Sequence, residues 1–404
     1  MTEATPILGL LLGLMACVIS FLLYPPVLRF ARKKNIVDNP DARKLQREPV
    51  PVLGGLVVFV SFALTMPVAY VLFGTKKLVV GFIAVMMMTV IGIWDDLKNL
   101  PAAFRFVVEI VMVWLLMQFG GFYINDLHGL WGVNEISFWW AAPLSIFAGV
   151  GLINAINLID GVDGYSSGYG IGASLVFATA LFRVQAYAAA ACLLILAGAL
   201  LPFFLHNLFG KKSKMFIGDG GTLLLGTAMT IAVFYFLHSG SPCAALEQDG
   251  VGLVAFTLAV LAVPVFDTLR VMTLRMARGN SPFNPDKTHL HHLFIEMGFS
   301  HVATAGSILA LNTLVVLIWW LSWKLGASVT WQFYIVVLMG LLITFVFYKF
   351  VRIQQARDSR VYAWLCGIGD RSHRFLLPAW VFVRKLVDSF VLTRFYVRVR
   401  SFFK

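Results

Sequence analysis

Long apolar runs, separated by short polar segments, dominate the pattern of this chain. Within each run the apolar residues are continuous, whereas the strands of a membrane β-barrel would alternate over about ten residues. Most runs approach the roughly 20 residues that a helix needs to cross a bilayer. We therefore predict an all-α, polytopic membrane helical bundle with about 11 transmembrane helices. The expected spans are 6–28, 54–73, 78–94, 104–119, 137–156, 167–182, 187–206, 220–238, 251–270, 303–323 and 331–350.

The basic residues indicate how the bundle is oriented. Of the 32 Lys and Arg residues, all but Lys76, Lys77, Arg183 and Lys324 lie in loops on one side of the expected bundle or in the C-terminal segment. Lys and Arg accumulate on the cytoplasmic side of membrane proteins. We therefore predict that the N-terminus lies outside and that the C-terminus lies in the cytoplasm.

Composition supports the membrane class and narrows the partners. Hydrophobic residues make up 59% of the chain and charged residues only 13%, with a net charge of +12. Soluble domains carry about a quarter charged residues. The positive charge is explained by cytoplasmic loops, so no nucleic-acid partner is predicted. The four cysteines show no CxxC spacing, which argues against a zinc site or a disulfide framework.

The segment after position 350 differs from the rest of the chain. Basic residues alternate there with aromatic and aliphatic ones, as in RKLVDSFVLTRFYVRVRSFFK. We predict two parts, a transmembrane domain with cytoplasmic active-site loops over 1–350 and a basic amphipathic cytoplasmic tail over 351–404. Such a tail is typical of a segment on a membrane surface. A tail that docks on the bundle explains the pattern equally well.

Acidic residues gather at the ends of the expected spans. An aspartate at the centre of a membrane helix costs about 2.5–3.5 kcal/mol, so such residues tend to be functional. The predicted orientation places every one of these acidic segments at the cytoplasmic face. The residues are Asp95, Asp96, Asp160, Asp163, Asp219, Asp267 and Asp286.

The surroundings of these aspartates suggest phosphate and cation chemistry. Asp95 and Asp96 are adjacent like charges, which favour a bound proton or cation, although a solvated helix end is the alternative. Asp160 and Asp163 lie among glycines, which let backbone amides approach a phosphate, although a simple turn is the alternative. Asp219 opens an expected helix, where it either serves an anion site or caps the helix.

Histidines and amides add polar groups at the same face. His289 and His292 would share one side of a helix, and His291 lies between them, in a basic loop without the spacing of a zinc site. These histidines could bind a phosphate or a sugar. Asn154 and Asn157 offer polar contacts near the end of the span 137–156. Together, these groups suit Mg²⁺-assisted phosphoryl transfer between a nucleotide and a lipid.

Six segments occur in the order of a known family. The chain resembles the polyprenyl-phosphate N-acetylhexosamine-1-phosphate transferases over about 7–350, especially the branch that uses UDP-GlcNAc in O-antigen, enterobacterial common antigen and teichoic-acid linkage synthesis. The segments are VDNPDARKLQREPVPVLGG at 37–55, GIWDDLKNL at 92–100, NAINLIDGVDGYSSG at 154–168, HNLFGKKSKMFIGDGGTLLLG at 206–226, PVFDTLRVMTLRMARGNSPFNPD at 264–286 and HLHHLF at 289–294.

The resemblance implies a role for most of these residues. Asp219 is the expected Mg²⁺ ligand, with Mn²⁺ as an alternative ion. The family often has Lys where this chain has Ala103, and Arg105 can supply that charge. No role is implied for Asp267. The expected catalytic residues are Asp95, Asp96, Asp160, His289, His291 and His292. The expected substrate-binding residues are Arg43, Lys44, Arg105, Asn154, Asn157, Asp163 and Asn207.

The resemblance also implies a reaction. GlcNAc-1-phosphate, or a related HexNAc-1-phosphate, would pass from a UDP-sugar to undecaprenyl or another polyprenyl phosphate, in one step or through an aspartyl-phosphate. The enzyme would lie in the plasma (inner) membrane with its site facing the cytoplasm, and a homodimer is compatible with the likeness. One alternative is the phospho-MurNAc-pentapeptide transferase, which the HLHH loop disfavours because it lacks an HHH run. Another is an ion-coupled transporter, whose carboxylates would lie near the midplane.

Overall fold

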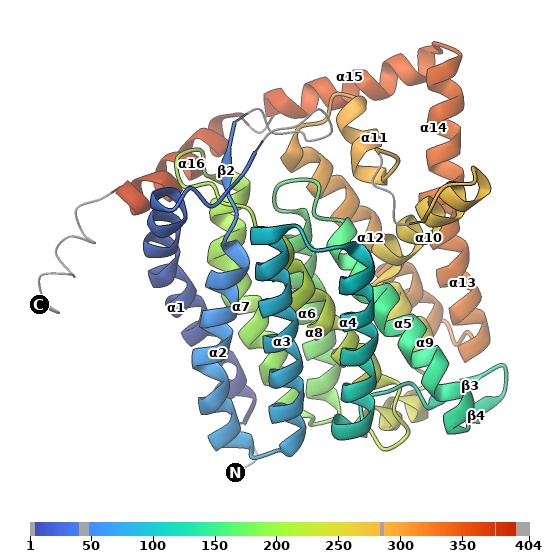
Figure 1. The fold of residues 1–404 in the computed structure, drawn as a ribbon. Helices are drawn as coiled ribbons and strands as arrows, with labels where there is room; N and C mark the ends of the chain where they lie inside the picture. The colour runs from blue at the N-terminus through green and yellow to red at the C-terminus, as the bar shows by residue number, and fades with distance from the viewer. Residues whose placement is uncertain (1–4, 40–47, 283–286, 376, 393–404) are drawn as a thin grey trace, which may run out of the picture.

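The computed structural model describes residues 5–39, 48–282, 287–375 and 377–392. The first helices are α1 (Thr5–Lys33), α2 (Gly54–Phe73), α3 (Lys76–Lys98), α4 (Ala102–Leu115), α5 (Phe138–Leu158), α6 (Tyr165–Arg183), α7 (Tyr187–Phe209) and α8 (Gly218–Phe236). The later ones are α9 (Leu253–Val260), α10 (Ala262–Ala277), α11 (Leu290–Glu296), α12 (His301–Lys324), α13 (Val329–Leu341), α14 (Phe347–Ala356), α15 (Arg360–Phe375) and α16 (Leu377–Leu392). Figure 1 shows most of them side by side in one bundle.

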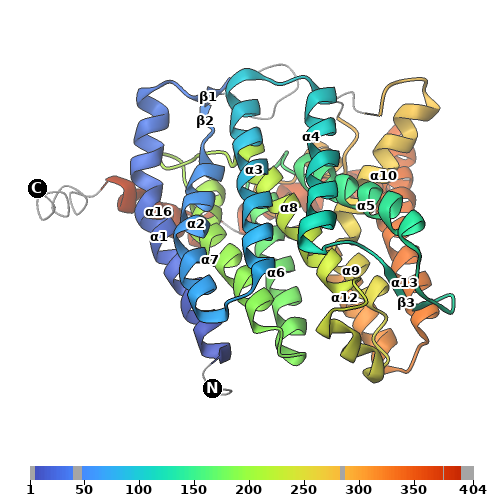
Figure 2. The same cartoon turned by 60° about the horizontal axis from the view of Figure 1, so that its bottom comes forward.

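Short elements complete the described chain. The helical turns are Leu116–Gly120, Pro242–Asp249 and Leu342–Val346. Two antiparallel hairpins pair β1 (Val37–Asp38) with β2 (Val50–Pro51) and β3 (Asp126–Leu130) with β4 (Val133–Glu135). The hairpins lie at opposite ends of the bundle, as Figures 1 and 2 show. Because the strands are short and helices make up most of the described chain, the predicted all-α class is confirmed.

The described residues contain fewer candidate membrane spans than the expected eleven. Nine helices among the described residues are long and apolar enough to cross a membrane, or ten if the bent pair Pro242–Asp249 and Leu253–Val260 forms one span. Every expected span coincides with helix, but α6 is not among the nine because its first half is rich in Gly and Ser. The expected span 251–270 is broken at Leu261.

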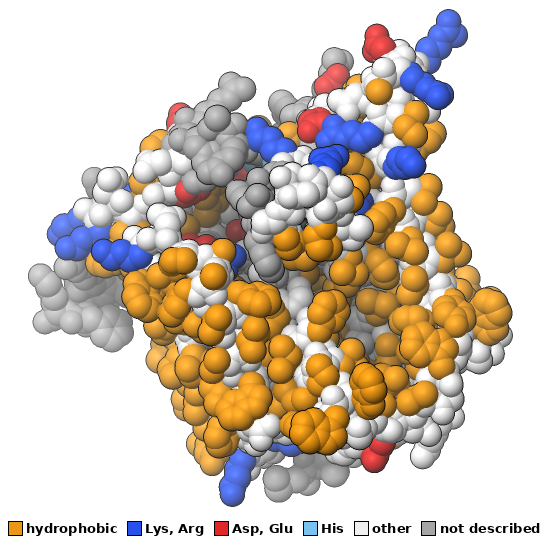
Figure 3. Space-filling view, turned by 45° about the vertical axis from the view of Figure 1, so that its right-hand side comes forward, with side chains coloured by type: hydrophobic (Ala, Val, Ile, Leu, Met, Phe, Trp, Pro, Cys, Tyr) orange, Lys and Arg blue, Asp and Glu red, His pale blue; other side chains and the backbone are white. Residues whose placement is uncertain are grey.

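Large apolar side chains cover the sides of the bundle. Many of them are exposed, such as Val71 and Trp139, which a soluble protein would bury. In Figure 3 they form a broad surface, and most charged side chains in view lie at its two ends. This distribution fits a multi-pass membrane protein, in which lipid covers the apolar belt.

Small residues bring the helices close together. A Cβ atom added at Gly198 in α7 would lie 2.0 Å from the carbonyl oxygen of Gly13 in α1. A Cβ atom added at Gly92 in α3 would lie 2.4 Å from the carbonyl oxygen of Asp219 in α8. Close backbone approach through small residues is the usual way in which membrane helices pack. The contact at Gly92 sets the aspartates of α3 beside the start of α8.

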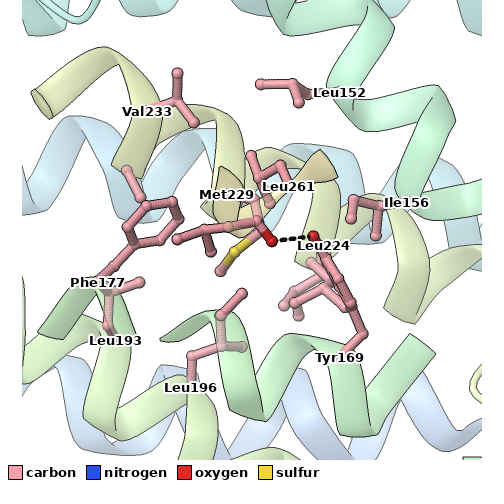
Figure 4. Packing of buried hydrophobic residues seen from close by; sticks show 14 of the residues in the cluster. Leu152, Ile156, Tyr169, Phe177, Leu193, Leu196, Leu224, Met229, Val233 and Leu261 are labelled. Atoms are coloured by element: carbon pink, nitrogen blue, oxygen red, sulfur yellow. Dashed lines mark hydrogen bonds between the residues drawn. The ribbon is translucent and has the colours of Figure 1, made fainter. Parts of the chain in front are cut away.

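The break between α9 and α10 is stabilised from two other helices. The carbonyl oxygen of Val260 accepts hydrogen bonds from the Tyr169 hydroxyl at 2.6 Å and from the Asn312 side chain at 2.9 Å. Asn312 also accepts from the N–H of Val263 at 3.0 Å. Figure 4 shows Tyr169 reaching across the buried apolar core to this break. The side chains thus satisfy backbone groups that a continuous helix would pair internally.

The C-terminal helices cross one end of the bundle. A continuous helix runs from Val329 to Ala356, so the expected domain boundary at position 350 falls inside it. From there α15 and α16 run over the end of the bundle toward α1 and α7, as Figure 1 shows. Asp388 of α16 accepts hydrogen bonds from the turn after α7. The described tail therefore docks on the bundle, and its contact with a membrane surface remains a prediction.

Candidate active site

A cavity of about 630 Å³ opens at the end of the bundle where the aspartates lie. Acidic side chains are visible inside the hollow at this end in Figure 3. The wall comes from the ends of α3, α5 and α7, the start of α8 and the neighbouring loops. Its predicted members are Asp95, Asp96, Asn157, Asp160, Asp163, Asn207, Asp219 and His292. Its further members include Asp38, Asn39, Asn99, Lys214, Phe216, Thr222 and His301.

Asp96 caps the start of α8. Its carboxylate accepts hydrogen bonds from the backbone N–H groups of Asp219 at 2.8 Å and Gly220 at 3.0 Å. Gly218 has a φ of 69°, and a Cβ atom there would lie 2.4 Å from Asp96. A carboxylate at this position is stabilised by the helix dipole and by otherwise unpaired N–H groups. Capping is thus done by Asp96, and the Asp219 side chain has other contacts.

Asp219 presents its carboxylate to the cavity. The Asn157 side-chain amide donates to Asp219 Oδ1 at 2.6 Å and to the Thr222 hydroxyl oxygen at 2.8 Å. Arg105 Nη1 lies 3.8 Å from the same Asp219 oxygen. About a third of the Asp219 side chain, 34%, is exposed. The carboxylate is therefore oriented by an amide but stays accessible to a ligand.

Arg105 links the two acidic segments. It donates to Asp95 Oδ2 at 2.9 Å, and the N–H of Leu100 donates to Asp95 Oδ1 at 2.7 Å. The Arg105 Nε atom lies 3.7 Å from the Glu109 carboxylate. The buried Asn154 amide donates to Glu109 and therefore lies behind the cavity wall. The structure thus places Arg105 between Asp95 and Asp219 and Asn154 in a supporting layer.

The loop between α5 and α6 carries two aspartates with different surroundings. Asp163 Oδ2 lies 2.6 Å from Lys214 Nζ and 2.9 Å from His301 Nδ1. Burial alone would raise the pKa of Asp163, but the His301 hydrogen bond and the charges of His301 and Lys214 lower it. Asp160 is exposed, lines the cavity and accepts a hydrogen bond from the Ser166 hydroxyl. The protein around Asp160 raises the pKa of its carboxyl to about 7.

Asn207 holds this loop to the turn before α8. Its side-chain oxygen accepts from the N–H of Gly164 at 2.6 Å, and its amide donates to the carbonyl oxygen of Met215 at 2.9 Å. Gly164 has a φ of 75°, which an L side chain rarely adopts. Asn207 is therefore both a wall residue and a bridge between two loops of the site.

Only one of the three histidines lines the cavity. His292 is in the wall, whereas the His291 ring packs under Gly161, where a Cβ atom would lie 2.1 Å from it. Burial, together with His292 and His289, holds the pKa of His291 well below its usual value. His289 is also buried, and its Nδ1 atom lies 3.0 Å from Asp267 Oδ2.

Asp267, which the sequence left without a role, organises the histidine segment. Its carboxylate accepts from Arg270 at 2.6 Å and from the N–H of Leu290 at 3.2 Å. Arg270 is almost fully buried and donates to the carbonyl oxygen of Thr288 at 2.6 Å. This pair therefore ties α10 to the start of α11, behind the cavity rather than in it.

Comparisons of the sequence with known proteins identify relatives of this chain. The profile of glycosyl transferase family 4 matches residues 78–237. The decaprenyl-phosphate N-acetylglucosaminephosphotransferase of Mycobacterium tuberculosis (strain CDC 1551 / Oshkosh) is 31% identical over 315 residues, 72% of this chain and 76% of the relative. The chain belongs to glycosyl transferase family 4. The undecaprenyl-phosphate alpha-N-acetylglucosaminyl 1-phosphate transferase of Escherichia coli O157:H7 is 28% identical over 284 residues, 67% of this chain and 72% of the relative.

The part of the chain that matches the family profile builds most of the cavity. Residues 78–237 run from α3 to α8, so they include five of the six described aspartates that line the cavity, all but Asp38. His292 and His301 lie outside the matched range. Arg43, Lys44 and Asp286 lie outside the described residues, so their expected roles stay predictions.

Among the wall residues that the sequence analysis missed, Lys214 and His301 are two that contact a predicted site residue, Asp163. Lys214 lies within the quoted segment HNLFGKKSKMFIGDGG, close in sequence to Asp219, and that position could have signalled a residue near the site. His301 begins α12, directly after the capping residue Ser300, and carries no sequence signal of its own. Both meet at Asp163, and only the fold brings them together.

The possible metal ligands of the cavity suit Mg²⁺ only when substrate phosphates complete its coordination. Among the described residues, no group of three or more His, Cys, Asp or Glu side chains could hold a metal ion. Mg²⁺ is usually bound through one or two carboxylates together with substrate phosphates. Asp219 fits this mode because its carboxylate is oriented by Asn157 and open to the cavity. The residues present thus fit Mg²⁺, or Mn²⁺, with a phosphate ligand completing the site.

Proposed function

We propose that this membrane enzyme transfers GlcNAc-1-phosphate from UDP-GlcNAc to a polyprenyl phosphate. An oxygen of the lipid phosphate would attack the β-phosphorus of the nucleotide sugar, the bond between the two phosphates would break, and UMP would leave. The relatives' names support polyprenyl phosphate as acceptor. The observation that carries the proposal is the convergence of five aspartates, Arg105 and Lys214 at one end of a membrane bundle.

The residues of the site would have different roles in this reaction. Asp219 would hold Mg²⁺, which supplies positive charge to the pyrophosphate oxygens when bound. Arg105, which lies beside Asp95 and Asp219, would neutralise charge on the transferred phosphate. An Asp95 or Asp96 carboxylate would keep the lipid phosphate deprotonated. The open cavity wall around Asn157, Asp163 and Asn207 would bind the nucleotide, in line with the resemblance.

The cavity would face the cytoplasm, where a soluble nucleotide sugar is available. The excess of Lys and Arg at this end of the bundle supports that orientation. The ion-coupled transporter is less well supported, since the carboxylates lie at one end of the bundle and not at its midplane. The HLHH segment continues to favour a GlcNAc donor over a MurNAc-pentapeptide donor.

A transfer assay tests the reaction and the metal ligand together. Purified protein in detergent receives polyprenyl phosphate, Mg²⁺ and radiolabelled UDP-GlcNAc, and label is followed into the lipid phase while UMP is measured. We expect transfer by the unaltered protein, at least about a hundredfold less with Asp219→Asn, and none after chelation. Asp249→Asn, a matched change at an exposed site at the other end of the bundle, should retain activity.

Each alternative outcome has a defined meaning. Transfer from UDP-MurNAc-pentapeptide but not from UDP-GlcNAc would move the donor and keep the reaction class. Absence of transfer from any nucleotide sugar, with a folded protein, would overturn the proposal. Release of UMP in a burst before lipid is added would favour a route through an aspartyl-phosphate.

A further inference from the structure

The turn between α7 and α8 carries two residues into the cavity wall. Lys214 pairs with Asp163, and Phe216 lies further along the same turn. The N–H of Phe216 donates to the carbonyl oxygen of Pro51 at 2.8 Å, which fixes the end of the turn next to α8. The position of Lys214 therefore depends on what holds the other end of this turn, at 211–213.

Helix α16 holds that other end through one carboxylate. Asp388 Oδ1 accepts from the backbone N–H groups of Lys212 at 3.0 Å and Ser213 at 2.9 Å, and from the Ser213 hydroxyl at 2.9 Å. The N–H of Lys211 donates to the same carboxylate at 3.2 Å. Successive backbone N–H groups that converge in this way form an anion-binding concavity.

Contacts around this carboxylate extend the interface. The ring of Trp380 in α16 lies 5.0 Å from the ring of Phe209, the last residue of α7. From the opposite side, the Tyr24 hydroxyl of α1 donates to the carbonyl oxygen of Ser213 at 2.8 Å, and Arg32 donates to that of Lys212. The turn is thus held between α1, which binds its carbonyl groups, and α16, which binds its N–H groups.

Opposite charges favour the contact between Asp388 and the turn. Three lysines occupy positions 211, 212 and 214, so the turn concentrates positive charge that an aspartate can offset. Partial burial would raise the pKa of Asp388, but the N–H groups of Lys212 and Ser213 and the Ser213 hydroxyl lower it. Asp388 is therefore ionised at neutral pH, as the contact requires.

We propose that Asp388 is a positioning residue for the nucleotide sugar, because it sets the turn that carries Lys214 to Asp163. This inference rests on the proposed transfer reaction. Asp388 itself lines no part of the cavity wall, so it acts through Lys214. Helix α16 of the C-terminal tail then helps to shape the site for the nucleotide sugar, in addition to any contact of the tail with a membrane surface.

Kinetics of two matched variants test this role. Asp388→Asn keeps the shape of the side chain but removes its charge, and Asp358→Asn makes the same change at an exposed position of the tail. We expect Asp388→Asn to raise KM for UDP-GlcNAc by about fivefold or more, the scale of one lost charged hydrogen bond. Its kcat and its KM for polyprenyl phosphate should change less than twofold, and Asp358→Asn should match the unaltered protein.

A second measurement does not need activity. Trypsin cleaves after Lys211 and Lys212, both of which are exposed, once the backbone there can open. We expect this cleavage to be severalfold faster in Asp388→Asn and in Asp388→Ala than in Asp358→Asn. Asp388→Glu should restore slow cleavage in part, because it restores the charge.

The outcomes separate the two proposals. Equal donor KM values for Asp388→Asn and Asp358→Asn, in protein that transfers sugar, would overturn the positioning role and leave the reaction intact. An equal loss in kcat and in both KM values would also overturn it, since it would show a general structural defect. If the unaltered protein transfers nothing, the proposed reaction fails, and the positioning role, which rests on it, fails too. Trypsin cleavage then tests only the contact between α16 and the turn.

Discussion

Five aspartates of the cavity wall have different partners and therefore different chemical characters. Asp95 is paired with Arg105, Asp96 binds two backbone N–H groups, and Asp163 is paired with Lys214 and His301. In these three aspartates, cationic side chains or backbone N–H groups occupy oxygens of the carboxylate. Asp160 and Asp219 instead accept from a neutral hydroxyl or amide and face the cavity. Of these five carboxylates, they are the two that accept no hydrogen bond from a cationic side chain or a backbone N–H among the described residues, so they are the most open to an incoming cation.

Asp160 should give the enzyme a pH dependence near neutrality. Burial, with a smaller contribution from the Asp219 charge, raises its pKa to about 7, and the Ser166 hydrogen bond offsets part of this rise. A carboxyl with a raised pKa is neutral below that pH and ionised above it. We expect kcat/KM for UDP-GlcNAc to rise with pH through about 7 and then to level off, and Asp160→Asn to lack this rise.

Asp163→Asn is the control for this pH profile. The pKa of Asp163 is lowered by His301 and Lys214, so its carboxyl is ionised throughout the range. Its substitution should lower activity at every pH and keep the rise. A rise that persists in Asp160→Asn would show that another group titrates.

The buried pair of Asp267 and Arg270 should matter for folding more than any surface pair. Asp267→Asn leaves the Arg270 guanidinium, 1% exposed, without its counter-charge. Breaking one partner of a buried pair costs about 3–5 kcal/mol. We expect a large drop in the thermal unfolding temperature in detergent. Asp249→Asn, which breaks the exposed pair with Arg183, should change it little, and equal drops would contradict the argument.

At the scale of elements, the contact between α3 and α8 determines the geometry of the site. Gly92→Ala would place a methyl group 2.4 Å from the backbone oxygen of Asp219, so one helix must move. Because α3 carries Asp96 and α8 carries Asp219, we expect at least about a tenfold loss of transfer with the protein still folded. Gly81→Ala on the same helix has ordinary contacts at 3.7 Å and should be silent. Equal transfer activities of Gly92→Ala and Gly81→Ala would show that the two helices accommodate the added methyl group without disturbing the site.

The helices themselves could be predicted from sequence because apolar length alone determines them. The break at Leu261 could not, since it depends on Tyr169 and Asn312, which lie 91 and 52 positions from Val260. The same distinction holds in the site. Aspartates at span ends were visible as costly polar residues, and five of the seven meet in one cavity, whereas Asp267 lies behind it and Asp286 lies outside the described residues.

Which residues face the cavity was harder to predict, because helix packing decides it. Asn154 and Asn157 are neighbours on α5, yet Asn154 turns to Glu109 while Asn157 turns to Asp219. His289 and His291 belong to one short motif with His292, yet only His292 reaches the wall. In each case the deciding partner comes from a distant helix.

At the scale of the whole molecule, the two ends of the bundle should lie on opposite sides of the membrane. The cavity, the β1–β2 hairpin and the tail lie at one end, and the β3–β4 hairpin lies at the other. Four basic residues were assigned to the second end, against 28 of the 32 at the first or in the tail. Lys and Arg mark the cytoplasmic side, so the cavity should open to the cytoplasm.

Cysteine labelling can test this orientation. Cys17, Cys192, Cys243 and Cys366 are first replaced, and a single cysteine is then introduced by Arg357→Cys near the tail or by Asn134→Cys in the β3–β4 hairpin. Both positions are exposed. In intact cells, a reagent that does not cross membranes should label only the Asn134→Cys protein. In inverted vesicles it should label only the Arg357→Cys protein, and the reverse pattern would place the cavity, and therefore the nucleotide sugar, outside.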